Sequence, residues 1–306
     1  MNHKILNKLE NMIHVSPKLL RNPETLRQAI RGAFAVDVED VSYNNIGELV
    51  DKIDNLVLDN YFRNVWQGHI KKFKYSGPAL IDEVNNLKPR KVLDIGCGIA
   101  GPAIVMARDM CAQRVVGVDV EPQVIARGTL NVTNANLRSA IELKLIKPGP
   151  LPFSNEKFDV VFSKDSLIHI QDKATFFQEI LRVLKPNGIF AASDWLASDN
   201  SDELPEFKKW VEISPHKFAM QTKVQTENRL REAGFANVLT KDKNDWYVDL
   251  SLAEIERMEG PLRERFLEVC GEDAYQEILK IRRANAEAAR CGGLRPTHLR
   301  GSKVNR

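Results

Sequence analysis

The sequence predicts an α/β protein built on a doubly wound, mostly parallel sheet of seven strands. Short apolar runs with strand character alternate with segments of helical periodicity from Lys91 onward, and this alternation is typical of parallel sheets covered by helices. A glycine-rich turn after the first of these runs is the second observation, because such turns join strand to helix in this class of fold. Strands are expected near residues 91–95, 114–118, 141–145, 158–163, 188–194, 235–240 and 294–299.

Helical patterns account for most of the remaining chain. Apolar side chains recur at helical spacing within residues 5–13, so we expect residues 1–74 to form a helical extension or lid ahead of a main domain at residues 75–306. A helical insertion is expected after the fifth strand, within residues 200–243, and further helices across residues 251–290. The N-terminal helices are amphipathic, which suits a homodimer interface as well as a lid over a substrate.

Turn residues set the limits of several elements. Pro186-Asn187-Gly188 predicts a sharp turn that begins the fifth strand. Gly234 predicts the end of a helix over residues 226–233, since glycine commonly ends helices. Gly292-Gly293 separates the last helices from the last strand. Pro102 begins the helix that follows the glycine-rich turn.

Composition and charge argue against several classes of protein. The 306 residues are 43% hydrophobic and 28% charged, with a net charge of +3, so no strongly basic surface for nucleic acid is expected. No apolar run approaches the length of a membrane span, and the N-terminus lacks the apolar core of a signal peptide. The four cysteines are scattered without a Cys-x-x-Cys pair, so neither a zinc site nor a disulfide framework is indicated. We therefore expect a cytoplasmic protein without a metal, membrane or nucleic-acid partner.

The most informative segment is Val92–Gly101, with the sequence Val-Leu-Asp-Ile-Gly-Cys-Gly-Ile-Ala-Gly. Its three glycines form a Rossmann-like G-x-G-x-x-G turn, a pattern that enzymes using nicotinamide or flavin cofactors share. Asp94 precedes the first glycine by two residues, where a negative charge would disfavour a phosphate. A carboxylate there suits a ligand with a cationic head, such as the amino acid portion of S-adenosylmethionine. Asp119 ends the next apolar run, where an acid can hold ribose hydroxyls.

Candidate site residues gather at the carboxyl ends of the predicted strands. Ligands of doubly wound sheets bind beyond these ends. Asp94, Gly96, Asp119, Asp165 and Asp194 all lie at or just past them, so we expect them around one pocket.

Two further segments carry informative patterns. Residues 158–170, Phe-Asp-Val-Val-Phe-Ser-Lys-Asp-Ser-Leu-Ile-His-Ile, resemble phosphoethanolamine N-methyltransferases, and Ser193-Asp194-Trp195 continues the match. Residues 60–68, Asn-Tyr-Phe-Arg-Asn-Val-Trp-Gln-Gly, are similar to a segment of sarcosine and dimethylglycine methyltransferases. The chain thus resembles class I S-adenosylmethionine-dependent methyltransferases over roughly residues 75–300. This resemblance implies S-adenosylmethionine as the cofactor and a small molecule as the substrate.

The glycine turn and the resemblance together predict the cofactor-binding residues. The family usually places an acid after the third strand to meet the adenine amine, and Lys147 stands at that position here. Adenine would then be recognised by backbone or by another side chain. The expected cofactor-binding residues are Asp94, Gly96, Gly98, Asp119, Val120, Lys147 and Lys164.

The resemblance also implies three catalytic residues. An ammonium acceptor must lose a proton before it attacks the methyl group, and a suitable base accelerates such a step about 10²–10⁴-fold. The family uses the histidine that matches His169 in that role, and Asp165 would orient it or contact the acceptor. Tyr61 matches a pocket position of the family. A helix-capping histidine near Asp172 and a turn or N-cap carboxylate at Asp165 are the structural alternatives.

Several aromatic residues are candidates for the acceptor pocket, where they would offer a cation–π surface. The structural alternative for each is a place in the core. His216 and Phe218 stand where phosphoethanolamine enzymes have an arginine and a tyrosine for phosphate, which favours a smaller or differently charged acceptor. Arginines near the end of the chain could reach an acceptor carboxylate, but a solvated helix face is the favoured explanation. The expected acceptor residues are Trp66, Tyr75, Trp195, Trp210 and His216.

The sequence therefore predicts N-methylation of a small amine-containing metabolite. S-methylation of a thioether such as methionine is the alternative within the same chemistry, and it would need a dry aromatic pocket but no base. A binding module or a macromolecule-modifying enzyme is the alternative from another class. The small net charge argues against RNA, and the complete set of Asp94, Gly96, Gly98 and Asp119 argues against a lost cofactor site.

Overall fold

The computed structural model describes residues 90–214 and 218–305. The expected N-terminal helices and the expected boundary between residues 74 and 75 lie outside the described residues. The chain divides into two compact units. Among the described residues, 90–251 and 284–305 belong to the unit that contains the sheet, and 252–283 belong to a smaller helical unit.

A seven-stranded sheet with the order β3-β2-β1-β4-β5-β7-β6 confirms the predicted fold class. The first five strands pair in parallel, whereas β7 is antiparallel to both β5 and β6. All seven strands lie where the sequence predicts them, within a few residues at their ends. Their bounds are Lys91–Ile95 for β1, Arg114–Asp119 for β2, Ile141–Leu145 for β3, Phe158–Lys164 for β4, Leu184–Ala197 for β5, Ala236–Asp242 for β6 and Leu294–Ser302 for β7.

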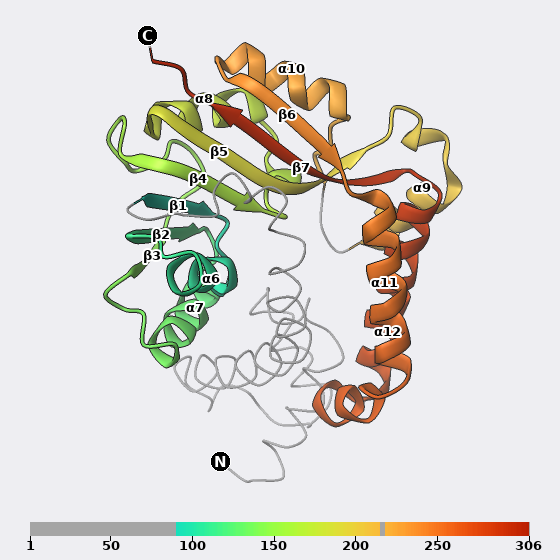
Figure 1. Ribbon diagram of the computed structural model, residues 1–306. Helices are drawn as coiled ribbons and strands as arrows, with labels where there is room; N and C mark the ends of the chain where they lie inside the picture. Colours follow the sequence, from blue (N-terminus) through green and yellow to red (C-terminus); the bar gives the residue numbers. More distant parts are fainter. Residues whose placement is uncertain (1–89, 215–217, 306) are drawn as a thin grey trace, which may run out of the picture. The chain divides into compact units, whose positions relative to one another are not determined.

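Helices cover both faces of the sheet, as a doubly wound fold requires (Figure 1). Side chains alternate between the two faces, so Val92 packs beneath α6 (Gly101–Arg108) and α7 (Pro122–Asn134). Leu93 points the other way, into the cluster that α8 (Lys173–Val183) and α10 (Lys223–Ala233) cover. Val92 and Leu93 are both completely buried, so this sheet has two cores rather than one solvated face.

The expected turn at Pro186-Asn187-Gly188 lies inside β5 as a bulge rather than before it. Phe158 of β4 pairs with Leu184 of β5, but Val160 pairs with Ile189. The register therefore shifts between these two pairs, and the extra residues of β5 include this turn. Asn187 has a φ of 61°, a left-handed conformation that asparagine tolerates better than most residues. Lys303 closes the bulge, because its backbone carbonyl accepts from the Asn187 N–H at 2.8 Å.

The helical insertion after β5 contains η5 (Ser201–Glu203) and α9 (Pro205–Ile213). α10 then ends at Gly234, whose φ of 105° confirms the predicted glycine stop. Two long helices, α11 (Asn244–Glu259) and α12 (Arg263–Arg290), separate β6 from β7. Gly271, with a φ of 75°, breaks the second of them.

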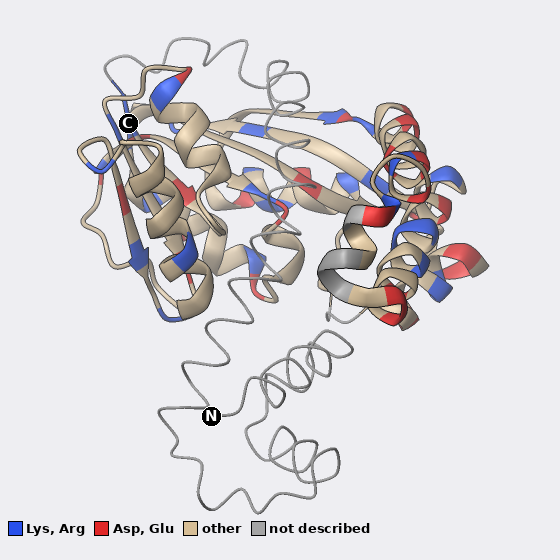
Figure 2. Ribbon diagram, turned by 90° about the horizontal axis from the view of Figure 1, so that it is seen from below, with Lys and Arg blue, Asp and Glu red and all other residues tan. Residues whose placement is uncertain are grey.

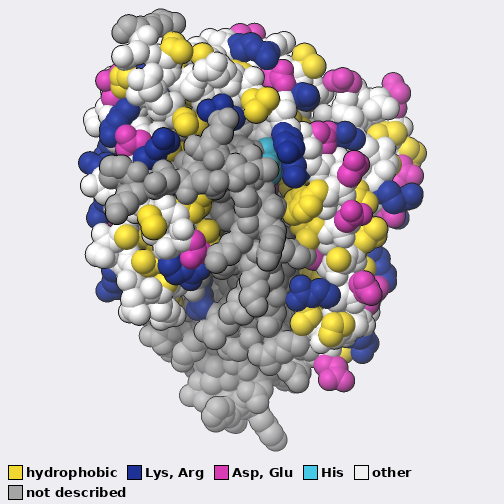
Figure 3. All heavy atoms as spheres, in the orientation of Figure 1, with side chains coloured by type: hydrophobic (Ala, Val, Ile, Leu, Met, Phe, Trp, Pro, Cys, Tyr) yellow, Lys and Arg dark blue, Asp and Glu magenta, His cyan; other side chains and the backbone are white. Residues whose placement is uncertain are grey.

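The smaller unit, residues 252–283, has a core of its own. Met258, Phe266, Tyr275 and Leu279 are buried together, and the Tyr275 hydroxyl donates to the Met258 carbonyl oxygen at 3.2 Å. Acidic and basic side chains are interspersed along α11 and α12 and over the visible surface (Figures 2 and 3). Among the described helices, none combines the length and the apolar character that a membrane crossing requires.

Candidate functional site

The glycine-rich turn leaves the carboxyl end of β1 in a conformation that only glycine adopts easily. Gly96 and Gly98 have φ values of 68° and 53°. The Gly96 N–H donates to the Val118 carbonyl oxygen at 2.9 Å, which fixes the turn against the end of β2. A Cβ on Gly96 would lie 1.9 Å from the Ser166 Oγ, whereas a Cβ on Gly98 would meet no atom within 4 Å. The backbone at Gly98 therefore borders open space.

Asp119 ends β2 and organises the neighbouring turns with its carboxylate. Its Oδ2 accepts the Gly98 N–H at 3.0 Å, and its Oδ1 accepts the N–H groups of Val120 and Glu121 at 2.8 and 3.1 Å. Because two carboxylate oxygens offer about four acceptor positions, one remains for a hydroxyl group. The Val120 side chain beside it is 46% exposed, which is unusual for a valine next to a sheet.

Asp94 is a buried carboxylate that lacks a counter-ion among the described residues. It is 1% exposed, and its Oδ2 has no hydrogen-bond partner among them. Burial, assisted by the negative charge of Asp119, raises the pKa of Asp94 to about 7. A cationic ligand would supply the missing partner and favour the ionised form. The orphaned oxygen, the open space at Gly98 and the spare acceptor position of Asp119 together fit an amino acid head attached to a ribose.

A short 3-10 helix, η4 (Leu167–His169), follows β4 and is capped by a carboxylate from β5. The Asp194 Oδ2 accepts the N–H groups of Ser166 and Leu167 at 3.0 and 2.6 Å. Its Oδ1 accepts those of Ile168 and Trp195 at 3.1 and 2.7 Å. Asp194 is 1% exposed, and burial together with the charge of Asp165 raises its pKa to about 7. The sequence places Asp194 at the pocket but gives no sign of this capping role.

Asp165 and His169 lie at the two ends of the turn that Asp194 caps. Asp165 has a φ of 52°, and its N–H donates to the Ser193 carbonyl oxygen at 2.8 Å. Its side chain forms an ion pair with Lys164. His169 is exposed, and its ring centroid lies 6.0 Å from that of Phe218. The cap of α8 is Asp172, which accepts the Thr175 N–H at 3.0 Å.

The turn that carries His169 contacts the glycine-rich turn directly. The Ser166 hydroxyl donates to the Gly96 carbonyl oxygen at 3.4 Å and to the Lys164 carbonyl oxygen at 3.0 Å. The two turns follow neighbouring parallel strands, since Ile95 pairs with Ser163. The candidate base and the candidate cofactor loop are therefore adjacent, as the strand-end argument predicts.

An aromatic cluster borders η4. Trp195 lies between Trp210 and Tyr247, with ring centroids 5.7 Å from each. Trp210 stacks on Phe218 at 4.8 Å with an interplanar angle of 12°. Trp210 is 1% exposed and belongs to this packed core, as its structural alternative expects, while Trp195 is only partly buried.

Lys173 fixes the segment after α9 against η4. Its ammonium is buried and donates to the carbonyl oxygens of Ile170, at 2.8 Å, and Ala219. The Ala219 N–H donates to the Ile168 carbonyl oxygen at 2.7 Å. Phe218 directly precedes Ala219, so these bonds hold its ring beside His169. Burial lowers the pKa of Lys173, and the charge of Asp194 opposes that shift.

The remaining predicted residues are less central or lie outside the described residues. Lys147 is exposed on the segment after β3, which the Ile146 N–H joins to the Asp119 carbonyl oxygen at 2.9 Å. Lys164 is occupied by its ion pair with Asp165. The candidates outside the described residues are Tyr61, Trp66, Tyr75 and His216.

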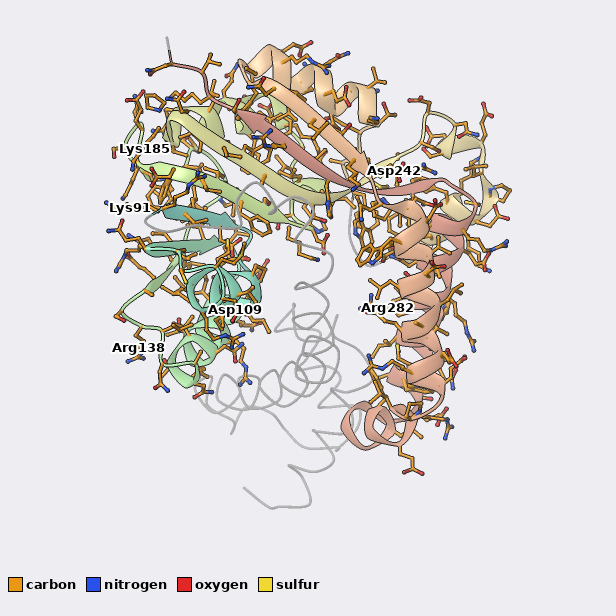
Figure 4. All side chains as sticks on the ribbon, in the orientation of Figure 1. Lys91, Asp109, Arg138, Lys185, Asp242 and Arg282 are labelled. Carbon is orange, nitrogen blue, oxygen red and sulfur yellow. The ribbon has the colours of Figure 1, made fainter. Side chains whose placement is uncertain are left out.

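The opposite edge of the sheet holds structural rather than ligand-facing charges. Lys91 and Lys185, labelled in Figure 4, lie at the edge where the parallel strands begin. Both contact Asp159, through the Lys91 N–H at 2.8 Å and the Lys185 Nζ at 2.8 Å. Asp159 at this edge is therefore paired with the Lys185 ammonium, whereas Asp94 at the other edge has no counter-ion among the described residues.

Fold and site together define a class of domain. The strand order with an antiparallel β7, the glycine-rich turn after β1 and the acids at the ends of β1 and β2 are those of a Rossmann-like domain for an adenosine derivative with a cationic amino acid head. This class was expected from the sequence.

Comparisons with known proteins agree. Residues 93–192 match the family described as the methyltransferase domain. Phosphoethanolamine N-methyltransferase 1 of Arabidopsis thaliana is 29% identical over 198 residues, which are 64% of this chain and 39% of that protein. Haemonchus contortus phosphoethanolamine N-methyltransferase 2, solved with phosphomonomethylethanolamine and S-adenosylhomocysteine, gives a TM-score of 0.65 at 23% identity, covering 71% of this chain and 50% of that chain. A putative sarcosine dimethylglycine methyltransferase from Galdieria sulphuraria gives 0.63 at 21% identity, covering 74% and 84%.

Residues 93–192 thus form a methyltransferase domain, and the chain is similar to class I S-adenosylmethionine-dependent methyltransferases. This similarity supports S-adenosylmethionine as the cofactor of the domain. The resemblance to phosphoethanolamine N-methyltransferases expected from residues 158–170 is confirmed. The chain spans 39% of the length of the Arabidopsis relative.

Proposed function

We propose that the protein methylates the nitrogen of a small amine with S-adenosylmethionine as the methyl donor. The observation that carries the proposal is the exposed imidazole of His169 on η4, in a turn that contacts the glycine-rich loop through Ser166 and Gly96. The names of the relatives, phosphoethanolamine N-methyltransferases, support an amine acceptor.

Residues at the carboxyl ends of β1 and β2 would bind the cofactor. Asp94 would neutralise the ammonium of the amino acid head, and Asp119 would accept a ribose hydroxyl. Gly98 leaves room for the ligand beside its backbone. When bound, the cofactor supplies an electrophilic methyl group on a sulfonium centre.

Residues of the turn after β4 would bind and deprotonate the methyl acceptor. His169 would take the proton that an ammonium must lose before its nitrogen lone pair can attack, a contribution of about 10²–10⁴-fold. Asp165 would attract the ammonium and hold it near His169. Asp194 fixes the turn with three hydrogen bonds, so that both groups keep one geometry. Such positioning can contribute about 7–11 kcal/mol to a two-substrate reaction.

A thioether acceptor is the competing candidate, and the aromatic cluster around Trp195 is the observation that favours it. A thioether has no proton to lose. Its methylation would depend on a dry aromatic surface and would be indifferent to a base.

One variant separates the two functions. We expect His169→Ala to lower kcat/KM for a small amine by about 10²–10⁴-fold. Binding of S-adenosylhomocysteine should stay unchanged, as measured by calorimetry. Trp195→Leu serves as the matched variant in the aromatic cluster. Methionine turnover that survives His169→Ala but not Trp195→Leu would replace the amine assignment with sulfur chemistry.

A further inference from the structure

Lys173 is a buried ammonium at an unfavourable place in the fold. It is 4% exposed, and it forms no ion pair with any described residue. It is also the first residue of α8, where the positive end of the helix dipole disfavours a cation. Burial lowers its pKa, because a buried ammonium loses its hydration. Local rules of stability are usually broken in this way where a residue serves function.

The neighbouring turn η4 gives the buried charge a purpose. Asp194 accepts three backbone N–H groups at the start of η4. Lys173 donates to the carbonyl oxygen of Ile170, the residue that ends η4, at 2.8 Å. A carboxylate at the start of a helical turn and an ammonium at its end both match the direction of the peptide dipoles. The turn is therefore held between two opposite charges.

Lys173 also joins η4 to a segment 46 residues further along the chain. Its ammonium donates to the Ala219 carbonyl oxygen as well. The same segment is tied to the end of β5, because the Ala197 N–H donates to the Gln221 carbonyl oxygen at 3.0 Å. One side chain from α8 thus connects the turn after β4 to a chain segment that follows α9.

The residues on both sides of the proposed base are fixed by this connection. Before His169 in the chain, the Ile168 carbonyl oxygen accepts the Ala219 N–H at 2.7 Å. After His169, the Ile170 carbonyl oxygen accepts from Lys173. The backbone that carries the imidazole is therefore restrained on either side, and both restraints depend on the segment or the ammonium that Lys173 supplies.

The same connection places an aromatic ring beside the imidazole. Phe218 immediately precedes the residue to which Lys173 donates, and its ring centroid lies 6.0 Å from that of His169. On another side the ring stacks on the buried Trp210, at 4.8 Å and 12°. Movement of this segment would alter the surroundings of the imidazole as well as its backbone.

We propose that Lys173 is a positioning residue for the methyl transfer, whose buried ammonium holds the imidazole of His169 and the ring of Phe218 in one fixed arrangement. This inference rests on the proposed N-methylation and on its base. Lys173 acts through His169 rather than on the substrate or the cofactor. Because a misplacement of about 1 Å can cost about 10²-fold in rate, loss of the ammonium should lower kcat and spare cofactor binding.

The test removes the ammonium and measures its coupling to the base. Lys173→Met keeps an unbranched side chain without any N–H donor, and we expect kcat for a small amine to fall about tenfold or more. The affinity for S-adenosylhomocysteine, measured by calorimetry, should be unchanged. In the His169→Ala background the same substitution should lower kcat by less than about threefold, since a residue that acts through the base has little to add once the base is gone. A general structural defect would multiply in both backgrounds.

A second variant breaks the connection at its other side. Ala219→Pro removes the N–H that donates to Ile168 and leaves the ammonium in place, at a position outside helices and strands. It should show the same pattern, with a lower kcat, unchanged cofactor affinity and little further loss beside His169→Ala. It keeps the test decisive if Lys173→Met does not fold.

Lys185→Met is the matched control. Lys185, labelled in Figure 4, is a partly buried lysine whose ammonium pairs with Asp159 at 2.8 Å, at the edge where the parallel strands begin. The same chemical change is made there, far along the strands from η4. This variant should keep the wild-type kcat.

The possible failures are distinct. A wild-type kcat in each variant that folds, a parallel loss of cofactor affinity, or losses that multiply with that of His169→Ala would overturn the positioning role while the N-methylation stands. A wild-type enzyme that turns over no small amine, or a His169→Ala variant with the wild-type rate, overturns the proposed function and this inference together.

Discussion

The Ser166 hydroxyl and the Gly96 carbonyl oxygen lie 3.4 Å apart, which joins the turn after β4 to the turn after β1. This contact leaves no room for a side chain at Gly96, since a Cβ there would lie 2.6 Å from the Ser166 Cβ as well. This contact couples the turn that carries the proposed base to the proposed cofactor loop.

Substitution of the two glycines should give different results. We expect Gly96→Ala to displace both turns and to lower stability as well as cofactor binding. Gly98→Ala meets no atom and should cost only about 1 kcal/mol for its left-handed backbone. Its methyl group would nevertheless occupy the space proposed for the cofactor. Thermal unfolding and titration with S-adenosylhomocysteine separate the effects, and equal behaviour of the two variants would contradict this assignment of the loop.

Cofactor binding should depend on pH through Asp94. Its pKa of about 7 means that the carboxyl is mostly protonated at pH 6, and a cation bound beside it favours ionisation. The affinity for S-adenosylhomocysteine should therefore be about tenfold weaker at pH 6 than at pH 8, with release of a proton on binding. Calorimetry in buffers of different ionisation enthalpy measures that release. Asp94→Asn should bind more weakly and with no such dependence; a pH-dependent Asp94→Asn would place the titrating group elsewhere.

Asp194→Asn tests the cap of η4. In the asparagine side chain an NH₂ group replaces one of the two carboxylate oxygens. The two backbone N–H groups that donated to that oxygen then face another donor and lose their hydrogen bonds. We expect a loss of about 3 kcal/mol in unfolding free energy and a fall in kcat that exceeds any change in cofactor affinity. Asp172→Asn is the matched control, because it caps α8 through a single residue. If both variants lost the same stability and activity, Asp194 would be an ordinary helix cap.

Acid should destabilise the protein partly through His298. Its folded-state pKa of about 4 is below the ordinary 6.5, so the unfolded chain binds the proton first as the pH falls through this range. The stabilising contribution of the neutral buried imidazole is thus present above pH 6.5 and is lost toward pH 4. His298→Phe should show a shallower fall in melting temperature across this window. The raised pKa values of Asp94 and Asp194 act in the opposite direction but cancel in the comparison. Parallel curves for the two proteins would show that His298 titrates normally.

The sheet could be predicted almost completely because each strand is a short apolar run bounded by turn residues. β1 and β3 have the predicted limits, and Gly234 ends α10 as expected. β5 was the exception: its bulge at Asn187 depends on a long-range contact with Lys303, which no local pattern reveals.

The proposed cofactor-binding residues could also be predicted from the sequence, because the carboxyl ends of neighbouring parallel strands lie side by side. The other half of the site depends on residues that are distant in sequence. Asp194 lies 26 to 28 residues after the amides of η4 that it caps. Which side chain of a later strand meets that turn depends on the register between β4 and β5, and a single sequence does not contain that register.

The cap supplied by Asp194 limits how the segment Ser163–Ile170 can be reused. Its three consecutive amides are satisfied by a side chain from β5, so the segment does not encode its own conformation. Transplanted into another sheet without an aspartate at the end of the neighbouring strand, it would keep its histidine but lose the shape that presents it. An engineer who wishes to move this proposed base to a new scaffold must move two strands.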